Sequence, residues 1–370
     1  MSGEQEVKVD GVALKGQQLE FYNTILEALG KKEKFHWCVL GLAGTGKTTL
    51  LKAIQNIPGD ELGYPKCLST AYVYTAAELI DARIINSIFS LENGQEPTYP
   101  WPGAIDRTNE KLHDIDVLLI DNINYVGDET FYLIDKRLRE ARRSAEPFGG
   151  ISVICFGDLY QQKQPKSIYA NGSRSLRLWR LFELFELTEN YRFQSEEERI
   201  VLKTIATLSD TPALTEEERA LMEEAKNYLG IHCQFHGESA QEVATKLREL
   251  RTDHGAEDGT FAAIIRYDGM VNNVKGLVKD VEEVVSAYNY QDSQGLSFDG
   301  VIVVRSTSWG GQAEPLNEGE FYSAISRAKS SLRNCCITPM DPMDFHWTVP
   351  AGANEEMARL RAANNQGNNP

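Results

Sequence analysis

Residues Gly41 to Thr49 constrain this chain more than any other stretch. They run Gly-Leu-Ala-Gly-Thr-Gly-Lys-Thr-Thr and match the phosphate-loop pattern G-x-x-x-x-G-K-[ST]. An apolar run, 35–40, is expected to form a buried strand before the motif, and 48–54 to form a helix after it. That order aims backbone N–H groups and the positive end of a helix at an anion. A glycine-rich loop that binds nothing is the alternative, and the flanking strand and helix argue against it.

The motif also assigns roles to side chains. Lys47 is expected to reach the β and γ phosphates of ATP, and the Thr48 hydroxyl to bind Mg²⁺. The expected nucleotide-binding residues of this loop are Gly41, Gly44, Thr45, Gly46, Lys47, Thr48 and Thr49.

Composition bounds the class of protein. The 370 residues are 42% hydrophobic, as in ordinary soluble globular chains. No apolar run approaches the roughly 18 residues of a membrane span, and the acidic, polar start does not resemble a signal or transit peptide. Six cysteines occur without a C-x-x-C pair. We therefore expect an intracellular protein with no membrane partner, and a monomer rather than an oligomer.

The net charge of -16 comes from 38 basic and 54 acidic residues. This balance argues against a protein that coats duplex DNA without specificity. It leaves room for a local basic groove, because electrostatic steering depends on where the charges lie.

Residues 1–190 alternate strand-like and helix-like segments, which is typical of a parallel sheet with crossover helices. A second α/β unit is expected over 191–350. The last segment, 351–370, ends in Asn-Asn-Gln-Gly-Asn-Asn-Pro and is expected to be a disordered tail. The fold class is therefore α/β, with two mainly parallel sheets flanked by helices.

Two further positions suit nucleotide chemistry. Asp121 ends the apolar strand 117–120, where a carboxylate could bind Mg²⁺ next to the phosphate loop, although an aspartate there could simply cap a turn. Gln161 follows another apolar strand and could sense the γ-phosphate or position a water molecule. Arg192 and Arg327 could be surface arginines, or could supply positive charge to a transferring phosphate.

In order, these motifs resemble those of superfamily 1 helicases, and most closely the Pif/RecD-like branch. The resemblance rests on the phosphate loop, Leu118-Leu-Ile-Asp121-Asn122, Gly157-Asp-Leu-Tyr-Gln161, Ser293-Gln-Gly295 and Tyr322–Lys329, and it covers about residues 10–338. It implies two RecA-like lobes that clamp ATP, with Arg192 and Arg327 acting from the second lobe. Gln18 falls at the position of the family's adenine-reading glutamine.

The resemblance also implies that single-stranded DNA crosses both lobes. The positions that match strand-contact motifs are Tyr72, Asn86, Ser87 and Gln294. Such binding would rest on backbone contacts and base stacking, and would therefore depend strongly on salt and little on sequence.

Three departures from the family pattern stand out. Asn122 replaces the glutamate that acts as general base, and a lost base costs about 10² to 10⁴ in rate. Asp292 replaces a lysine of the family pattern. The third departure is a short connection: only about twenty residues separate 271–274 from Ser293, where the family usually inserts a small β-barrel. The missing insert argues against duplex unwinding.

We expect an ATP-driven DNA helicase or translocase that hydrolyses slowly. The alternatives are a non-catalytic module that binds ATP and strand, and a viral-type RNA helicase.

Overall fold

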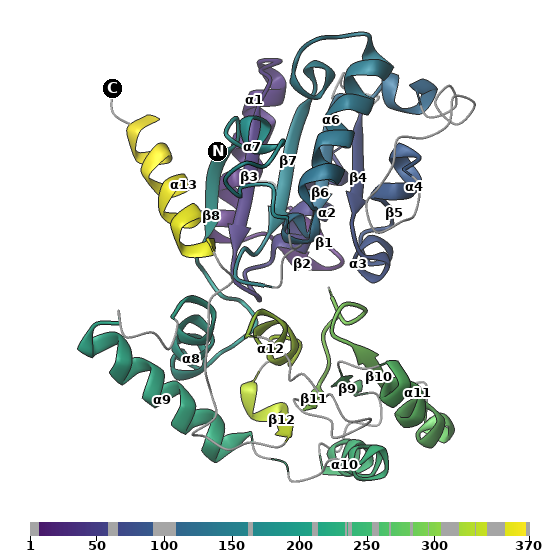
Figure 1. The fold of residues 1–370 in the computed structure, drawn as a ribbon, viewed down its shortest axis with the longest axis vertical. Coiled ribbons are helices and arrows are strands. Elements are labelled where there is room, and N and C mark those ends of the chain that lie inside the picture. Colours follow the sequence, from purple (N-terminus) through teal and green to yellow (C-terminus); the bar gives the residue numbers. More distant parts are fainter. Residues whose placement is uncertain are drawn as a thin grey trace, which may run out of the picture. The chain divides into compact units, whose positions relative to one another are not determined.

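The chain divides into two compact units in a computed structural model (Figure 1). The first unit contains 1–159, 163–189 and 354–370, and the second contains 160–162 and 190–353. The structure describes residues 7–57, 66–91, 109–161, 166–208, 214–233, 235, 239–253, 259–265, 268–281, 284–294, 296–304, 318–329, 331–338 and 352–367.

A sheet of six parallel strands organises the first unit, in the order β5-β4-β6-β7-β3-β8. The strands are β3 (His36–Gly41), β4 (Cys67–Ala71), β5 (Arg83–Ile84), β6 (Val117–Asp121), β7 (Ser152–Gly157) and β8 (Glu183–Leu187). All residues of β6 and β7 are buried, as expected for central strands covered on both faces. Because the strands are parallel, their carboxyl ends share one edge of the sheet.

Helices and a small hairpin complete the first unit. They are β1 (Lys8–Val9), β2 (Val12–Ala13), α1 (Gly16–Gly30), α2 (Lys47–Gln55), α3 (Tyr74–Leu79), α4 (Ile85–Phe89), η1 (Ile123–Tyr125), α6 (Asp128–Arg142), η2 (Pro147–Gly150), α7 (Leu176–Trp179) and α13 (Ala353–Gly367). Apolar residues at helical spacing place one face of α1 in the core, with Phe21 and Ile25 fully buried against the strands. The core thereby fixes the strand ends that carry the site.

The second unit is built on four parallel strands in the order β10-β9-β11-β12. Its elements are α8 (Glu196–Thr207), α9 (Glu216–His232), α10 (Ala240–Asp253), β9 (Phe261–Ile265), α11 (Asp268–Leu277), η3 (Lys279–Val281), β10 (Val285–Asn289), β11 (Gly300–Val304), α12 (Glu318–Ile325), η4 (Leu332–Asn334) and β12 (Cys335–Thr338). Within this unit α8 and α9 lie side by side (Figure 1). The two parallel, helix-flanked sheets confirm the expected fold class. Among the described residues, no helix has both the length and the apolar character that a membrane crossing requires.

The expectation of a disordered tail was wrong for residues 353–367, which form α13. Ala353, Met357 and Leu360 recur at helical spacing and are buried, so this segment has an apolar face despite its polar composition. The indole N–H of Trp179 donates to Glu356 Oε1 at 2.6 Å, and Arg361 pairs with Glu186 of the edge strand β8. The chain therefore returns to its first unit after completing the second (Figure 1).

Replacing Glu356 with alanine should destabilise the first unit by about 1 to 3 kcal/mol, because the buried Trp179 N–H would lose its acceptor. The variant would also leave Arg359 without the carboxylate that it contacts at 2.7 Å. Thermal unfolding measures the effect. Glu355→Ala, in the same helix but exposed, is the matched control and should unfold like the wild type. Equal melting temperatures for all three proteins would show that α13 contributes no stability through this contact.

Candidate active site

The phosphate loop joins the carboxyl end of β3 to the start of α2, as the motif predicts. Two of its glycines have positive φ, Gly44 with φ +88° and Gly46 with φ +78°, and a residue with a β-carbon would be strained at either position. Gly41 has a different constraint, because a β-carbon there would lie 2.5 Å from the Leu187 carbonyl oxygen. The loop can therefore close tightly only with these residues.

Two side chains brace the loop. Lys47 Nζ donates to the carbonyl oxygens of Gly41 at 2.7 Å and Leu42 at 2.9 Å, so its ammonium lies across the loop. Gln18 is buried in the first turns of α1, and its Nε2 donates to the Thr45 carbonyl oxygen at 3.1 Å. The structure thus brings Gln18 to the phosphate loop, while its contact with adenine stays a prediction. Thr48 and Thr49 lie half-buried in the first turn of α2.

Asp121 ends β6 at the same edge of the sheet, where β7 separates β6 from β3. Its carboxylate is buried, and burial raises its pKa to about 6. The Asn122 backbone N–H, which donates to Asp121 Oδ1 at 2.9 Å, and the positive charge of Lys47 both oppose that rise. Asp121 is therefore a desolvated carboxylate within electrostatic reach of the phosphate-loop lysine, an environment that a divalent cation would stabilise.

Asn122 follows in the left-handed region, with φ 55° and ψ 49°. Asparagine tolerates this conformation better than most residues. Within the described part of the chain, its buried Nδ2 has no hydrogen-bond partner. A buried amide donor without a protein partner is costly unless water or a ligand accepts from it. Asn122 can therefore orient a water molecule at this edge, but it cannot take its proton.

The expected strand-contact residues of the first unit follow β4 and β5. Tyr72 comes directly after β4 and is half-buried, whereas Asn86 and Ser87 lie in α4, with Ser87 exposed beside a cavity of about 670 Å³. Sequence reasoning assigned no role to Tyr74, which begins α3 and is 68% exposed. Exposure of a large aromatic ring next to this edge is the signal that distinguishes it, and exposure is not readable from the sequence.

The two expected arginines meet within the second unit. Nη1 of Arg192 donates to the Ser326 carbonyl oxygen, and Nη2 of Arg327 donates to the hydroxyl of the same serine at 2.9 Å. Burial and the charge of Arg327 lower the pKa of Arg192 to about 10, against an opposing effect of Tyr322. Two guanidinium groups held this close repel each other, and an anion bound between them would relieve that repulsion.

Two expected residues are less accessible than their proposed roles suggest. Gln294 is buried, and its amide donates to the Tyr290 carbonyl oxygen at 2.9 Å and to Ser323 Oγ at 2.8 Å. This burial does not fit a direct contact with a strand, and it places Gln294 as a support for the helix end that carries Arg327. Gln161 is also buried, just beyond β7. Residues 162–165, which follow Gln161, lie outside the described residues.

A phosphate loop, an acidic strand end and a parallel sheet define the first unit as a P-loop nucleotide-binding fold. A family model described as PIF1-like helicase matches residues 13–211, more than half of the chain, and a model of the viral superfamily 1 RNA helicase core domain matches 149–336. The chain belongs to the PIF1-like helicases of superfamily 1, which confirms the resemblance of its motifs.

Individual relatives match part of the chain. ATP-dependent DNA helicase PIF1 of Danio rerio is 34% identical over 127 residues, which are 33% of this chain and 19% of that protein. Pif1 of Bdellovibrio bacteriovorus is 29% identical over 124 residues, 33% of this chain and 27% of that protein. The human PIF1 helicase is 29% identical over 149 residues, 40% of this chain and 22% of that protein. The matches thus span about a quarter or less of these relatives.

Solved structures share the fold over nearly the whole chain. Pif1 of Candida albicans superposes with a TM-score of 0.69 at 12% identity, covering 95% of this chain and 100% of that one. Bacteroides Pif1 bound to single-stranded DNA gives a TM-score of 0.65 at 18% identity, covering 96% and 98%. At these identities the superpositions establish the architecture, and the activity has to be argued from the site itself.

Proposed function

We propose that this chain is an ATP-dependent translocase or helicase core that acts on single-stranded DNA and hydrolyses ATP slowly. The phosphate cradle with Lys47, within the first unit, carries the proposal, and the two neighbouring arginines within the second unit supply the positive charge that it calls for. Arg192 and Arg327 would act on the triphosphate that the loop holds, where added positive charge stabilises the transition state.

The residues present fit a magnesium ion. Thr48 and Asp121 would hold it, because one supplies a hydroxyl beside the loop and the other a buried carboxylate whose pKa burial has raised. A bound Mg²⁺ neutralises phosphate charge during transfer. The protein's own residues position the reacting groups. Lys47 would donate its hydrogen bonds to phosphate oxygens in place of the Gly41 and Leu42 carbonyl oxygens, and Asn122 would orient a water molecule.

Steady-state ATP hydrolysis, with and without oligo-dT, tests the proposal. We expect turnover that DNA stimulates and that a Lys47→Ala variant lacks, since this variant removes the charge that contacts the phosphates. Turnover no higher than that of Lys47→Ala under both conditions would contradict an ATP-driven motor.

Asn122 favours a second candidate, a module that closes on ATP and strand without turnover. Its side chain cannot serve as a base, and the described residues offer its Nδ2 no partner. This candidate predicts that the wild-type protein binds the strand in a nucleotide-dependent way but hydrolyses ATP no faster than the Lys47→Ala variant. The match to a viral RNA helicase core over 149–336 favours RNA as an alternative substrate, which salt-dependent competition between oligo-dT and oligo-U would decide.

Tyr74→Ala should lower affinity for oligo-dT by about 5- to 150-fold, because stacking of one base on an aromatic ring contributes about 1 to 3 kcal/mol. Fluorescence anisotropy with labelled oligo-dT measures the loss. Tyr191→Ala is the control, since Tyr191 is 43% exposed but lies in the second unit and outside the strand-contact motifs. Equal affinities for the wild type and Tyr74→Ala would exclude Tyr74 as a stacking platform.

A further inference from the structure

Positive charge is concentrated in one segment of this acidic chain. Residues 128–180 hold ten lysines and arginines against six aspartates and glutamates, although the whole chain has a net charge of -16. The segment spans α6, β7 and α7, all in the first unit. It lies outside the phosphate loop and outside the expected strand-contact motifs, so the proposed function gives these charges no role.

Arginines form a row on the exposed side of α7. Arg174, Arg177 and Arg180 are spaced by three residues and are all exposed, while Leu178 and Trp179 are buried beneath them. The helical turn extends past α7 itself, because the backbone N–H of Leu176 donates to Ser173 and that of Phe182 donates to Trp179. Residues three apart on a helical turn are neighbours, so Arg177 lies next to both Arg174 and Arg180 on the exposed side of this turn.

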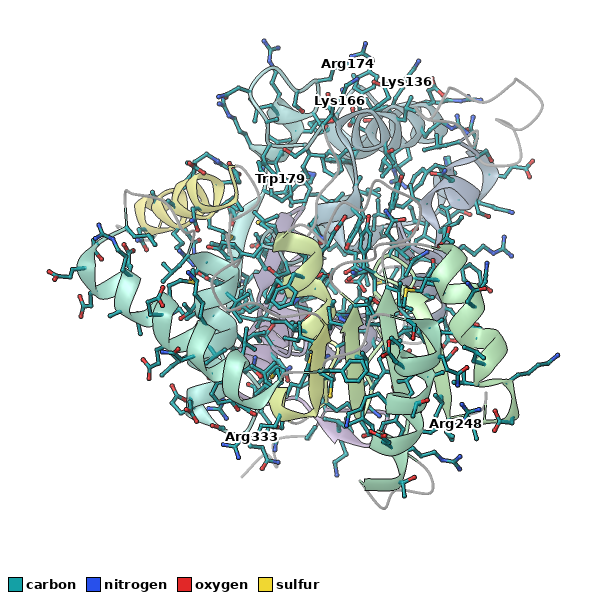
Figure 2. The ribbon with its side chains drawn as sticks, turned by 60° about the horizontal axis from the view of Figure 1, so that its bottom comes forward. Lys136, Lys166, Arg174, Trp179, Arg248 and Arg333 are labelled. Atoms are coloured by element: carbon teal, nitrogen blue, oxygen red, sulfur yellow. The ribbon has the colours of Figure 1, made fainter. Side chains whose placement is uncertain are left out.

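The row continues onto α6. Arg174 pairs with Glu129 at 2.8 Å and lies 5.9 Å from the centroid of the Tyr132 ring, and Lys136 follows Tyr132 by one helical turn. Lys166 joins from the neighbouring segment, where its carbonyl oxygen accepts from the Asp128 N–H at 2.9 Å. Figure 2 shows Lys136, Lys166 and Arg174 close together on one side of the first unit. We call these residues the α6–α7 basic surface: Lys136, Lys166, Arg174, Arg177 and Arg180.

The acidic groups of this surface are engaged. The Asp128 carboxylate accepts hydrogen bonds from Ser173 Oγ at 2.6 Å and from the backbone N–H groups of Arg174 and Ser175. Glu129 is held by Arg174. Within the described part of the chain, by contrast, no hydrogen bond or ion pair involves the side chain of Arg177 or Arg180. Arg177 and Arg180 therefore present two guanidinium groups that no carboxylate of the described residues pairs with.

We propose that the α6–α7 basic surface binds the phosphate backbone of duplex DNA, a role that rests on the proposed function of the chain as a DNA helicase core. A duplex presents a charge about every 1.7 Å on a stiff helix, which suits arginines placed at successive exposed positions of a helical turn. Guanidinium groups bind phosphate through paired hydrogen bonds. A single strand needs exposed aromatic rings for stacking, whereas Tyr132 lies against Arg174 and Trp179 is fully buried.

The acidic residues in the rest of the chain restrict where a duplex could bind. A net charge of -16 repels DNA from most faces, so a duplex would be attracted only where cations are concentrated. The surface would therefore orient the double-stranded part of a substrate relative to the first unit, without any contact to the bases and without sequence preference.

Charge reversal tests the proposal. The double variant Arg177→Glu, Arg180→Glu should lower affinity for a blunt duplex at least about tenfold at low salt and reduce the slope of log K against log salt by about 2. Affinity for oligo-dT of the same nucleotide length should change little. The control is Lys203→Glu, Lys279→Glu, which makes the same charge change at exposed positions of the second unit. Fluorescence anisotropy over a salt series measures both ligands, and melting temperatures confirm that all proteins are folded.

The outcomes separate this proposal from the proposed function. Wild-type protein that binds neither oligo-dT nor ATP contradicts the helicase core itself. If the wild-type protein binds oligo-dT but the double variant binds duplex as tightly as the wild type, the proposed duplex-binding surface is wrong while the helicase core stands. The α6–α7 basic surface would then be expected to bind an acidic protein partner. Equal losses in the double variant and its control also overturn it, because the effect would then reflect net charge. A duplex-selective loss in the double variant supports it.

Discussion

Replacing Arg192 with methionine should lower ATP turnover by about 10³- to 10⁵-fold, the range expected when an arginine that stabilises transition-state charge is removed. Methionine keeps much of the side-chain length and removes the charge. The second unit should change little in stability, because the cost of burying the charge is relieved while the hydrogen bond to the Ser326 carbonyl oxygen is lost. A base with a lowered pKa is charged at a free-energy cost in the folded state, and the variant is relieved of that cost.

A large loss of activity with little change in stability is what distinguishes a catalytic arginine from a structural one. Single-turnover hydrolysis and thermal unfolding measure the two quantities on the same samples. Lys203→Met, which removes an exposed charge from α8, is the matched control and should change neither. If Arg192→Met unfolds earlier while turnover stays at the wild-type rate, the arginine serves the fold of the second unit and the proposed charge complementarity is wrong.

Replacing Asn122 with glutamate should raise ATP turnover by about 10² or more, because it restores a carboxylate at the position of the family's general base. The same change should lower the free energy of unfolding by about 1 kcal/mol, since position 122 has φ 55° and glutamate tolerates the left-handed region less well than asparagine. Faster turnover in a less stable protein is the expected combination.

Asn122→Gln provides the control for this gain. It has the length of glutamate and the same backbone cost, but no basic group, so it should lose stability without gaining turnover. A flat rate for Asn122→Glu would place the limiting step elsewhere, with Asp292 as the next position to restore. Combining Asn122→Glu with Arg192→Met also gives the arginine experiment a faster parent rate against which to measure its loss.

Local patterns predicted most of the first unit because the relevant information lies within short segments. The glycines at 44 and 46 specify a conformation that few other residues adopt, and the apolar run before Asp121 predicts the buried strand that the structure contains. Asp121 and Lys47 could therefore be placed at one edge of a sheet from spacing alone. The desolvation that raises the pKa of Asp121 needed the packed structure.

Features that depend on distant partners escaped sequence reasoning. The strand β8 reads Glu-Leu-Phe-Glu-Leu, which has no strict alternation, and it is recognisable only as the edge partner of β3. The helix α13 looked disordered because its polar composition hides a narrow apolar face, which the first unit covers. The burial of Gln294 and the exposure of Tyr74 are likewise properties of packing, and no pattern of neighbouring residues carries them.

The return of α13 to the first unit makes the second unit an insertion, with both of its ends tied to one body. If the backbone were cut near residue 190, the two fragments would stay associated through the docked helix α13. The second unit is therefore held by the backbone at both of its ends, and a protease cut in one of the two connections would not by itself release it.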